Sequence, residues 1–330
     1  MKREKSKVRG QRTEVRIQMS EGRVRGSGFR ECWAAALAAL LLAGCATPQA
    51  QFSDADWVSH ATTGRGCFER GDFRRGADAY ARAQQRARAL DDADALAVSA
   101  VNRAVCLLAD SRPAEAGADL DEALADARTS PARRAELMTA AARVELALGR
   151  PDEVLSRGTA ALALKPRPPL RAQILLAQSG AWLVKSDPAT AAKVLAEGLS
   201  AGAWAKLPES IRAEWTARRG EIAAAEQKPA EAAALQDEAA AFWKQAGRLP
   251  EMARALAVAG YQKKAAGDLP GACDRFYRAA GSLWAQGLQA EAIRALDAGV
   301  VCAEELKDED TGRRMADLYV TFKSGKRLSP

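Results

Sequence analysis

Hydrophobic side chains recur along most of the chain at intervals of three and four residues, the spacing of one face of an α-helix. In residues 132–148 this stripe comprises Leu137, Met138, Ala141, Val144 and Leu148. In residues 169–185 it comprises Leu170, Ile174, Ala177, Ala181 and Val184. A β-strand would alternate hydrophobic and polar residues, and we find no convincing run of that kind. The pattern therefore predicts an all-α protein.

Prolines interrupt this helical pattern at two interleaved and nearly constant periods. The first series comprises Pro113, Pro151, Pro188, Pro229 and Pro270, at intervals of 38, 37, 41 and 41 residues. The second comprises Pro131, Pro169, Pro208 and Pro250, at intervals of 38, 39 and 42 residues. Because proline is tolerated in the first turn of a helix and breaks it elsewhere, each proline predicts a helix start. The 18–21 residues between successive prolines then hold one helix and a short turn.

Pairs of such helices form hairpins that must stack, because a single hairpin cannot bury its own hydrophobic stripe. We expect seven antiparallel hairpins over residues 54–323, the last made of 289–306 and 309–323. An aromatic content of only 5% and abundant alanine favour helices that pack closely through small side chains. The predicted fold is an α-solenoid, followed by a flexible tail over residues 324–330.

Two of the predicted hairpins carry a distinctive set of residues. The first set comprises Gly64, Gly71, Asp72, Phe73, Gly76, Tyr80 and Ala83, and the second Gly267, Asp268, Leu269, Ala272, Phe276 and Ala279. Weaker copies are Ala116/Leu120/Ala123 and Ala191/Leu195/Gly198, and the weakest are Val154/Gly158/Ala161 and Ala232/Gln236/Ala239. The spacing resembles the tetratricopeptide repeat, in which small residues let helices approach and an aromatic ring fills the space between hairpins. The resemblance implies a right-handed solenoid, although the 37–41-residue period is longer than the family's usual period of about 34.

The N-terminus has the pattern of an export signal. Basic residues up to Arg30 precede thirteen uncharged residues, 32–44, a run too short for a membrane-spanning helix. The run ends in Leu42-Ala43-Gly44-Cys45, which resembles the lipobox of bacterial lipoproteins. The resemblance implies cleavage between Gly44 and Cys45, removal of residues 1–44, and attachment of a diacylglycerol to Cys45.

Residues 45–53 would then form a lipidated cysteine and a short tether that keeps the solenoid close to a membrane. Ala46 replaces the Asp that tends to retain such proteins in the inner membrane, so the resemblance implies anchoring in the outer membrane, facing the periplasm. Met19 is an alternative start to Met1. The alternative interpretation of the hydrophobic run is a short buried helix with an incidental cysteine.

The net charge of +7 comes mostly from the N-terminal segment. Residues 1–44 hold ten Lys and Arg and four Asp and Glu, which leaves 39 basic and 38 acidic residues for 45–330. A protein that neutralises phosphates needs a concentrated cationic surface. The charge distribution therefore argues against nucleic-acid binding.

Four cysteines remain in the predicted mature chain: Cys67, Cys106, Cys273 and Cys302. An even number of cysteines in an oxidising compartment is consistent with disulfides. Parallel first helices of neighbouring hairpins place Cys67 and Cys106 at about one height, and antiparallel helices around Gly287 place Cys273 level with Cys302. We expect disulfides 67–106 and 273–302. The alternative is four buried free thiols.

Tetratricopeptide proteins bind peptides or protein segments along the concave face formed by the first helix of each hairpin, so the resemblance implies a protein partner. Polar side chains placed there by register are Arg65, Arg143, Gln173, Glu221 and Tyr261. Trp204, in the loop-like segment 202–205, is a further candidate for contact with a partner.

The sequence shows no catalytic constellation around its only histidine, His60, and no phosphate-binding or metal-binding motif. We therefore expect a non-enzymatic outer-membrane lipoprotein without cofactor or metal, which holds another envelope protein in an assembly or pilotin-like role. One alternative is binding of a small ligand or glycan, which would need an apolar pocket with convergent polar groups. Another is an enzyme acting on peptidoglycan, which would need paired carboxylates or a nucleophile.

Overall fold

A computed structural model describes residues 52–324, and this range forms fifteen helices and no β-strand. The first helices of the hairpins are α2 (Ala55–Glu69), α4 (Ala93–Ala109), α6 (Pro131–Ala147), α8 (Pro168–Val184), α11 (Glu209–Ala225), α13 (Leu249–Ala265) and α15 (Gln289–Leu306). The second helices are α3 (Phe73–Ala89), α5 (Pro113–Ala125), α7 (Pro151–Ala163), α9 (Pro188–Gly198), α12 (Pro229–Gln245), α14 (Leu269–Ala285) and α16 (Glu309–Lys323). These pairs confirm the predicted all-α solenoid and its helical hairpins.

The fifteenth helix, α10 (Ala201–Trp204), is a single turn between the fourth and fifth hairpins. The expectation that Trp204 lies in a loop is therefore wrong. Ser200 begins this turn, because its hydroxyl accepts a hydrogen bond from the N–H of Ala203 at 3.3 Å.

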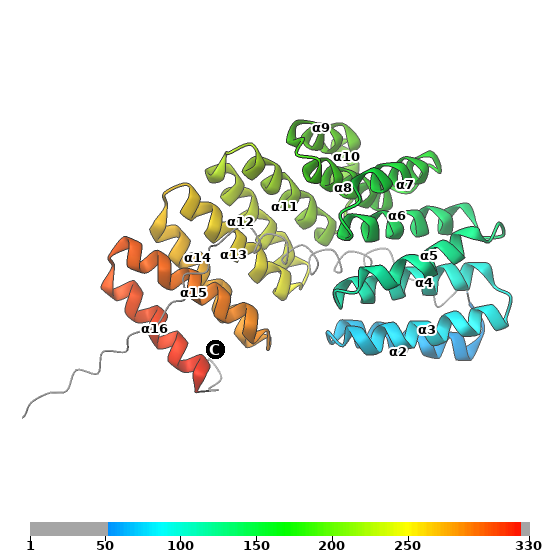
Figure 1. Ribbon diagram of the computed structural model, residues 1–330, viewed down its shortest axis with the longest axis horizontal. Helices are drawn as coiled ribbons and strands as arrows, with labels where there is room; N and C mark the ends of the chain where they lie inside the picture. Colours follow the sequence, from blue (N-terminus) through cyan, green and yellow to red (C-terminus); the bar gives the residue numbers. More distant parts are fainter. Residues whose placement is uncertain (1–51, 325–330) are drawn as a thin grey trace, which may run out of the picture.

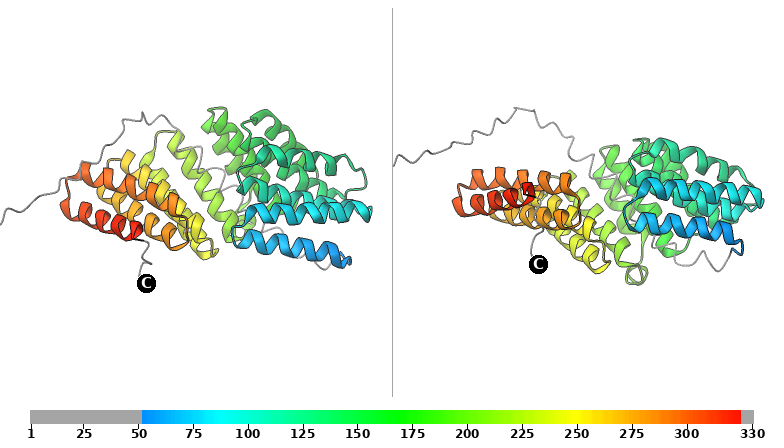
Figure 2. Two further views of the ribbon diagram at one scale, coloured as in Figure 1. Left: turned by 60° about the horizontal axis from the view of Figure 1, so that its bottom comes forward. Right: turned by 90° about the horizontal axis from the view of Figure 1, so that it is seen from below.

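The hairpins follow one another along an arch (Figure 1). The α2–α3 pair forms one end, α8–α10 lie at the top of the arch, and α15–α16 form the other end. Two further views show an elongated molecule with these two pairs at opposite ends (Figure 2). Its core is accordingly a series of hydrophobic clusters along the stack rather than one central core.

The prolines mark helix starts as predicted. Eight of the nine lie in the first turn of a helix: Pro113, Pro131, Pro151, Pro169, Pro188, Pro229, Pro250 and Pro270. Pro208 immediately precedes α11, as its N-cap residue. Proline is compatible with these positions because the first N–H groups of a helix have no partner within the helix.

Each turn within a hairpin contains one residue with a positive φ angle. These residues are Gly71, Ser111, Gly149, Ser186, Gln227, Gly267 and Lys307. The next residue donates its N–H to the carbonyl five positions earlier, for example Asp72 to Cys67 at 2.9 Å and Arg112 to Leu107 at 2.8 Å. This arrangement ends the first helix and reverses the chain. Glycine adopts the left-handed conformation without strain, whereas the four other residues adopt it at a cost.

The residues of the tetratricopeptide-like pattern pack as that pattern predicts. A Cβ atom built on Gly64 would lie 2.7 Å from the ring of Tyr80, and one on Gly260 would lie 2.9 Å from the ring of Phe276. Both rings are buried between the helices of one hairpin. Glycine is required at both positions because any larger side chain would occupy the space of the ring.

Hairpins in the middle of the solenoid pack differently from those at its ends. From α4 to α11 each first helix contacts the next first helix: α4 with α6, α6 with α8, and α8 with α11. Contacts from a second helix to the following first helix run along the whole stack, as in α3–α4, α5–α6 and α14–α15, and towards the ends they are the main contacts between hairpins. Consequently α4 buries thirteen of its 17 residues and α2 only four of 15.

Several sequence predictions lie outside residues 52–324. They are the cleaved segment 1–44, the cleavage site at Gly44, lipidation of Cys45, most of the tether 45–53, and the tail beyond residue 324. Within the described range, no helix combines the length and the hydrophobicity that crossing a membrane requires.

Candidate functional site

Three of the residues predicted for the concave face remain at least partly accessible. Tyr261 on α13 is 51% exposed, and its ring packs edge-on against that of Phe276, with 4.8 Å between the centroids. Arg65 on α2 is half-buried. Glu221 on α11 is also half-buried and forms an ion pair with Arg218 at 2.6 Å.

Arg143 and Gln173 are buried, so the expectation that they project into an open groove is wrong. Arg143 on α6 is 2% exposed and Gln173 on α8 is 4% exposed. The physical reason is the direct contact of α6 with α8 and of α8 with α11, which closes the space between these first helices. A prediction from the repeat spacing alone assumes that the inner side of every first helix faces solvent.

The buried face between α6, α8 and α11 contains a charge cluster made of Arg143, Glu214 and Arg218, with the half-buried Glu221 at its edge. The Nη2 of Arg143 donates to Oε1 of Glu214 at 3.3 Å, which links the third hairpin to the fifth. The intervening helix α8 has a glycine, Gly180, at this crossing. A Cβ atom there would lie 3.2 Å from a guanidinium nitrogen of Arg218, so the missing side chain leaves room for the arginine.

Burial governs the ionisation of this cluster. Desolvation raises the pKa of Glu214 to about 7, although Arg143 and Arg218 oppose the shift. Desolvation likewise raises the pKa of Glu221 and lowers that of Arg143. A buried ion pair of this kind contributes little net stability, but loss of one partner leaves an uncompensated buried charge. We therefore assign the cluster to the packing of three hairpins.

The four cysteines are buried free thiols in the structure. Cys67 and Cys106 lie on the same side of α3, because a Cβ atom built on Gly76 would be 3.7 Å from Cβ of Cys67 and 3.0 Å from Sγ of Cys106. Burial is the main cause that raises the pKa of Cys106 to about 12, and the neighbouring Cys67 adds to the shift. This thiol is therefore protonated at neutral pH, and the 67–106 disulfide stays a prediction.

The second cysteine pair lies near the C-terminal end of the solenoid. Cys273 on α14 and Cys302 on α15 are in the same hydrophobic cluster, and the thiol of Cys273 lies 3.9 Å from the carbonyl oxygen of Gly299. Burial, with a smaller contribution from the neighbouring Cys302, raises the pKa of Cys273 to about 11. The 273–302 disulfide also stays a prediction.

A pocket of about 490 Å³ lies where the regular stacking of hairpins is interrupted. The second helix of the fourth hairpin, α9, has 11 residues, whereas α3, α12 and α14 have 17. At 1.5 Å per residue, α9 is about 9 Å shorter than these helices. It ends at Gly198, whose carbonyl accepts a hydrogen bond from Nε of Arg171 at 3.0 Å. The chain then turns through α10 and leaves a space between α9 and α12.

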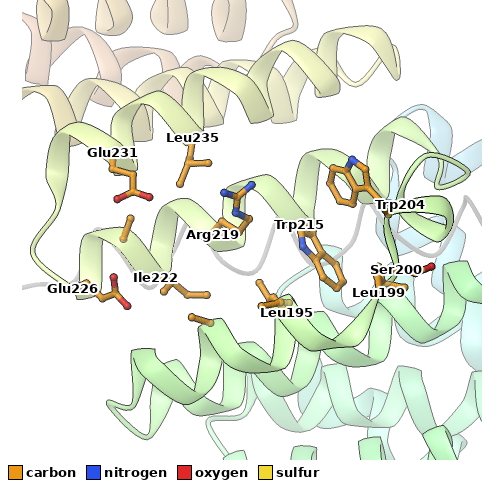
Figure 3. Close-up of a pocket in the computed structure, with 14 residues that line it drawn as sticks. Leu195, Leu199, Ser200, Trp204, Trp215, Arg219, Ile222, Glu226, Glu231 and Leu235 are labelled. Atoms are coloured by element: carbon orange, nitrogen blue, oxygen red, sulfur yellow. The ribbon is translucent and has the colours of Figure 1, made fainter.

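Most of the lining of this junction pocket is apolar. The residues around it are Ala192, Leu195, Ala196, Leu199, Ser200, Ala201, Trp204, Trp215, Arg219, Ile222, Ala223, Glu226, Glu231 and Leu235. Trp204 and Trp215 lie at one end, with ring centroids 6.2 Å apart in an edge-on arrangement (Figure 3). Glu226 and Glu231 lie at the opposite end, and Arg219 lies between the two ends (Figure 3). The pocket thus combines an aromatic end, a central cation and an acidic end.

Of the residues in the junction pocket, the sequence singled out only Trp204. Trp215, Arg219 and the two glutamates come from helices that are regular in sequence, so no motif distinguishes them. The local signal is the run Gly198-Leu199-Ser200-Ala201-Gly202, in which two glycines and a serine favour a turn and mark the early end of α9. Elsewhere in residues 52–324, no group of three or more His, Cys, Asp and Glu is arranged to hold a metal ion.

Comparisons with known proteins add little to this description. No protein-family model matches the sequence, and no curated protein matches it. Among solved structures, the chain is similar to the TPR2AB domain of yeast Sti1 in its complex with pHSP90. The two chains share 15% identity over 81% of this chain and 98% of the other, with a TM-score of 0.29. A likeness of this strength transfers no property of the yeast complex to this protein.

Proposed function

We propose that the protein is a non-catalytic scaffold that binds another protein of the cell envelope. The observation that carries this proposal is the junction pocket, where the aromatic side chains of Trp204 and Trp215 line a concave surface on a helical solenoid. Interface hot spots are rich in tryptophan and arginine held in such depressions. The extended stack provides a surface that orients what it binds.

Site-specific photo-crosslinking tests the proposed binding site. A photoreactive amino acid in place of the exposed Ala196 in the pocket would form an adduct with a partner protein in living cells. The matched control is Asp78, an exposed position on α3 outside the pocket. We expect a discrete protein adduct from position 196 and none from position 78. The same adducts from both positions, or none from either, would contradict the proposal.

The cellular location is a separate part of the proposal. The lipobox-like sequence ending in Cys45 supports a lipid-anchored protein on the periplasmic face of the outer membrane. Replacing Cys45 with alanine should abolish incorporation of radiolabelled palmitate and release the protein from the membrane fraction. Unchanged labelling of the Cys45→Ala variant would refute the anchor and leave the scaffold proposal standing.

The size of the junction pocket supports a second candidate function, binding of a small ligand. A volume of about 490 Å³ lies within the usual range of small-molecule sites. Native mass spectrometry of the purified protein distinguishes the two candidates. A stoichiometric low-mass adduct that disappears in the Trp204→Ala variant would favour the ligand-binding function.

A further inference from the structure

Three helices, α9, α11 and α12, each turn one face with lining residues at helical spacing towards the junction pocket. On α9 the lining positions are Ala192, Leu195 and Ala196, and Leu199 follows directly after this helix. On α11 they are Trp215, Arg219, Ile222 and Ala223, with Glu226 as the C-cap residue, and on α12 they are Glu231 and Leu235. Positions three, four and seven residues apart form one face of a helix, so the pocket is a groove bounded by three helical faces. A fourth helix packs into such a groove by ridge-and-groove contacts.

The groove also has a defined order of charges. Arg219 and Glu231 are exposed. Neither forms a direct ion pair within the described range, although Glu231 lies close enough to Lys228 to help raise the pKa of that lysine. Glu226 already pairs with Lys228 at 2.7 Å. Proceeding from the aromatic end, an occupant therefore meets an apolar surface, then the cation of Arg219, then the carboxylate of Glu231 (Figure 3).

We propose that the junction pocket binds an amphipathic helix of a partner protein. Its apolar face carries bulky side chains at helical spacing for the surface around Trp204, Trp215 and Leu235. Its flank carries an acidic residue opposite Arg219 and a basic residue opposite Glu231. This inference rests on the proposed scaffold function and specifies the chemistry of the partner.

Other occupants fit the groove less well. An extended peptide would depend on side chains of the walls for all its backbone hydrogen bonds, because the backbone groups of the wall helices are already bonded internally. A helix satisfies its own backbone and needs only side-chain contacts. A lipid acyl chain could fill the apolar end, but it would offer no partner to either Arg219 or Glu231.

Three labelled model peptides of 18 residues test the helical and the charge requirements. The first has a leucine and tryptophan stripe at helical spacing, with Glu and Lys placed to meet Arg219 and Glu231. The second has the same composition with the apolar residues scattered, and the third exchanges Glu and Lys. Fluorescence anisotropy with the purified full chain gives each dissociation constant. We expect the scattered peptide to bind at least about tenfold more weakly than the first, because it cannot present one apolar face.

The charge order is tested by exchanging charges on the protein. In the Arg219→Glu, Glu231→Lys double variant, the third peptide should bind about two- to fivefold more tightly than the first, the reverse of the unmodified protein. The Asp78→Lys variant is the control and should keep the original preference. Trp204→Ala should weaken both peptides while circular dichroism remains unchanged, because Trp204 lies on a single-turn helix at the edge of the stack.

Several outcomes would overturn the inference. Equal binding of the first and second peptides would refute helical recognition, and an unchanged preference in the double variant would refute the charge order. Binding of no peptide below about 1 mM would refute the docking site for a helix. If photo-crosslinking at position 196 still captures a protein in any of these cases, the scaffold function stands and only the helical partner is wrong. A lipid or small molecule found in the pocket instead would overturn both.

Discussion

The middle hairpins and the terminal hairpins share one turn design, yet they bury different surfaces. In the middle, α4, α6, α8 and α11 contact one another in sequence, and the second helices between them, α5, α7 and α9, have only 11 or 13 residues. At the C-terminal end, the second helices α12 and α14 have 17 residues and carry the contacts to the next hairpin. The difference shows that a solenoid can change its mode of stacking while it keeps the design of its turns.

Accessible side chains follow from this difference. In the middle, first-helix residues such as Arg143 and Gln173 are enclosed by neighbouring first helices. In the fifth and sixth hairpins, Tyr261 and Arg219 remain accessible. The junction pocket lies where one mode of stacking gives way to the other. We infer that the pocket results from the change of stacking, because the shortest second helix, α9, is found there.

The largest effect on stability is expected from a substitution that disrupts the packing of the C-terminal hairpins. Phe276 is fully buried against Gly260 and Gly299 in the C-terminal cluster. Replacing it with alanine should lower the free energy of unfolding by about 3–5 kcal/mol, because the lost ring leaves a cavity. Urea titration followed by circular dichroism measures the change. Val320→Ala, at a 66% exposed position on α16, is the control and should change stability by less than about 0.5 kcal/mol.

The next largest effect is expected from a substitution that disrupts the packing between the first helices in the middle of the solenoid. Arg143→Met should lower the free energy of unfolding by about 3 kcal/mol, because Glu214 then loses a buried partner. The double variant Arg143→Met, Glu214→Leu should recover most of this loss, since it removes both charges. Arg65→Met, at a half-buried position of the first hairpin, is the matched control. A double variant no more stable than the single one would show that the ion pair itself stabilises the middle hairpins.

The stability of the middle hairpins should also depend on pH, because they bury Glu214. Burial raises the pKa of Glu214 to about 7 in the folded protein, well above the usual value of 4.5. Between these values the folded state holds a proton that the unfolded state releases, so the contribution of Glu214 to stability is full below pH 4.5 and declines as the pH rises towards 7. Urea midpoints at pH 5 and pH 7.5 should therefore differ less in Glu214→Gln than in the unmodified protein. An identical difference in both proteins would mean that Glu214 is ionised throughout.

The smallest expected effect concerns the turns that both kinds of hairpin share. Ser111 and Gln227 have positive φ angles of 58° and 62°, which glycine adopts more readily. Each substitution, Ser111→Gly and Gln227→Gly, should raise the free energy of unfolding by up to about 1 kcal/mol. Gly71→Ala, at the equivalent turn of the first hairpin with φ 77°, should have the opposite sign. Thermal melts of the three variants, measured side by side, test the order.

Local rules of the chain made much of the fold predictable from sequence. The prolines at 131 and 151 begin α6 and α7, because proline fits only the first turn of a helix. The boundaries predicted for the last hairpin, 289–306 and 309–323, are those of α15 and α16. Tyr80 and Phe276 pack on Gly64 and Gly260, because small residues admit a ring at fixed helical spacing.

Which side chains are exposed, and which line a pocket, could not be predicted from these local rules. Repeat register assigned Arg143 to a solvent-exposed face, but α8 and α11 enclose it, and no residue within its own hairpin signals that contact. Trp204 was identified as a candidate because its segment looked loop-like in sequence, whereas Trp215 and Arg219 in a regular helix were not identified. Their common pocket exists only because α9 ends early and α12 lies across the gap.

The sequence by itself determined the helices, their starts and turns, and the pairing of neighbours into hairpins, because these depend on residues less than one repeat apart. Only the tertiary structure decided which first helices touch, which charges are buried, and where the stack leaves a pocket. Those features depend on the relative lengths and tilts of several hairpins together, and such collective geometry is not encoded in the spacing of any single motif.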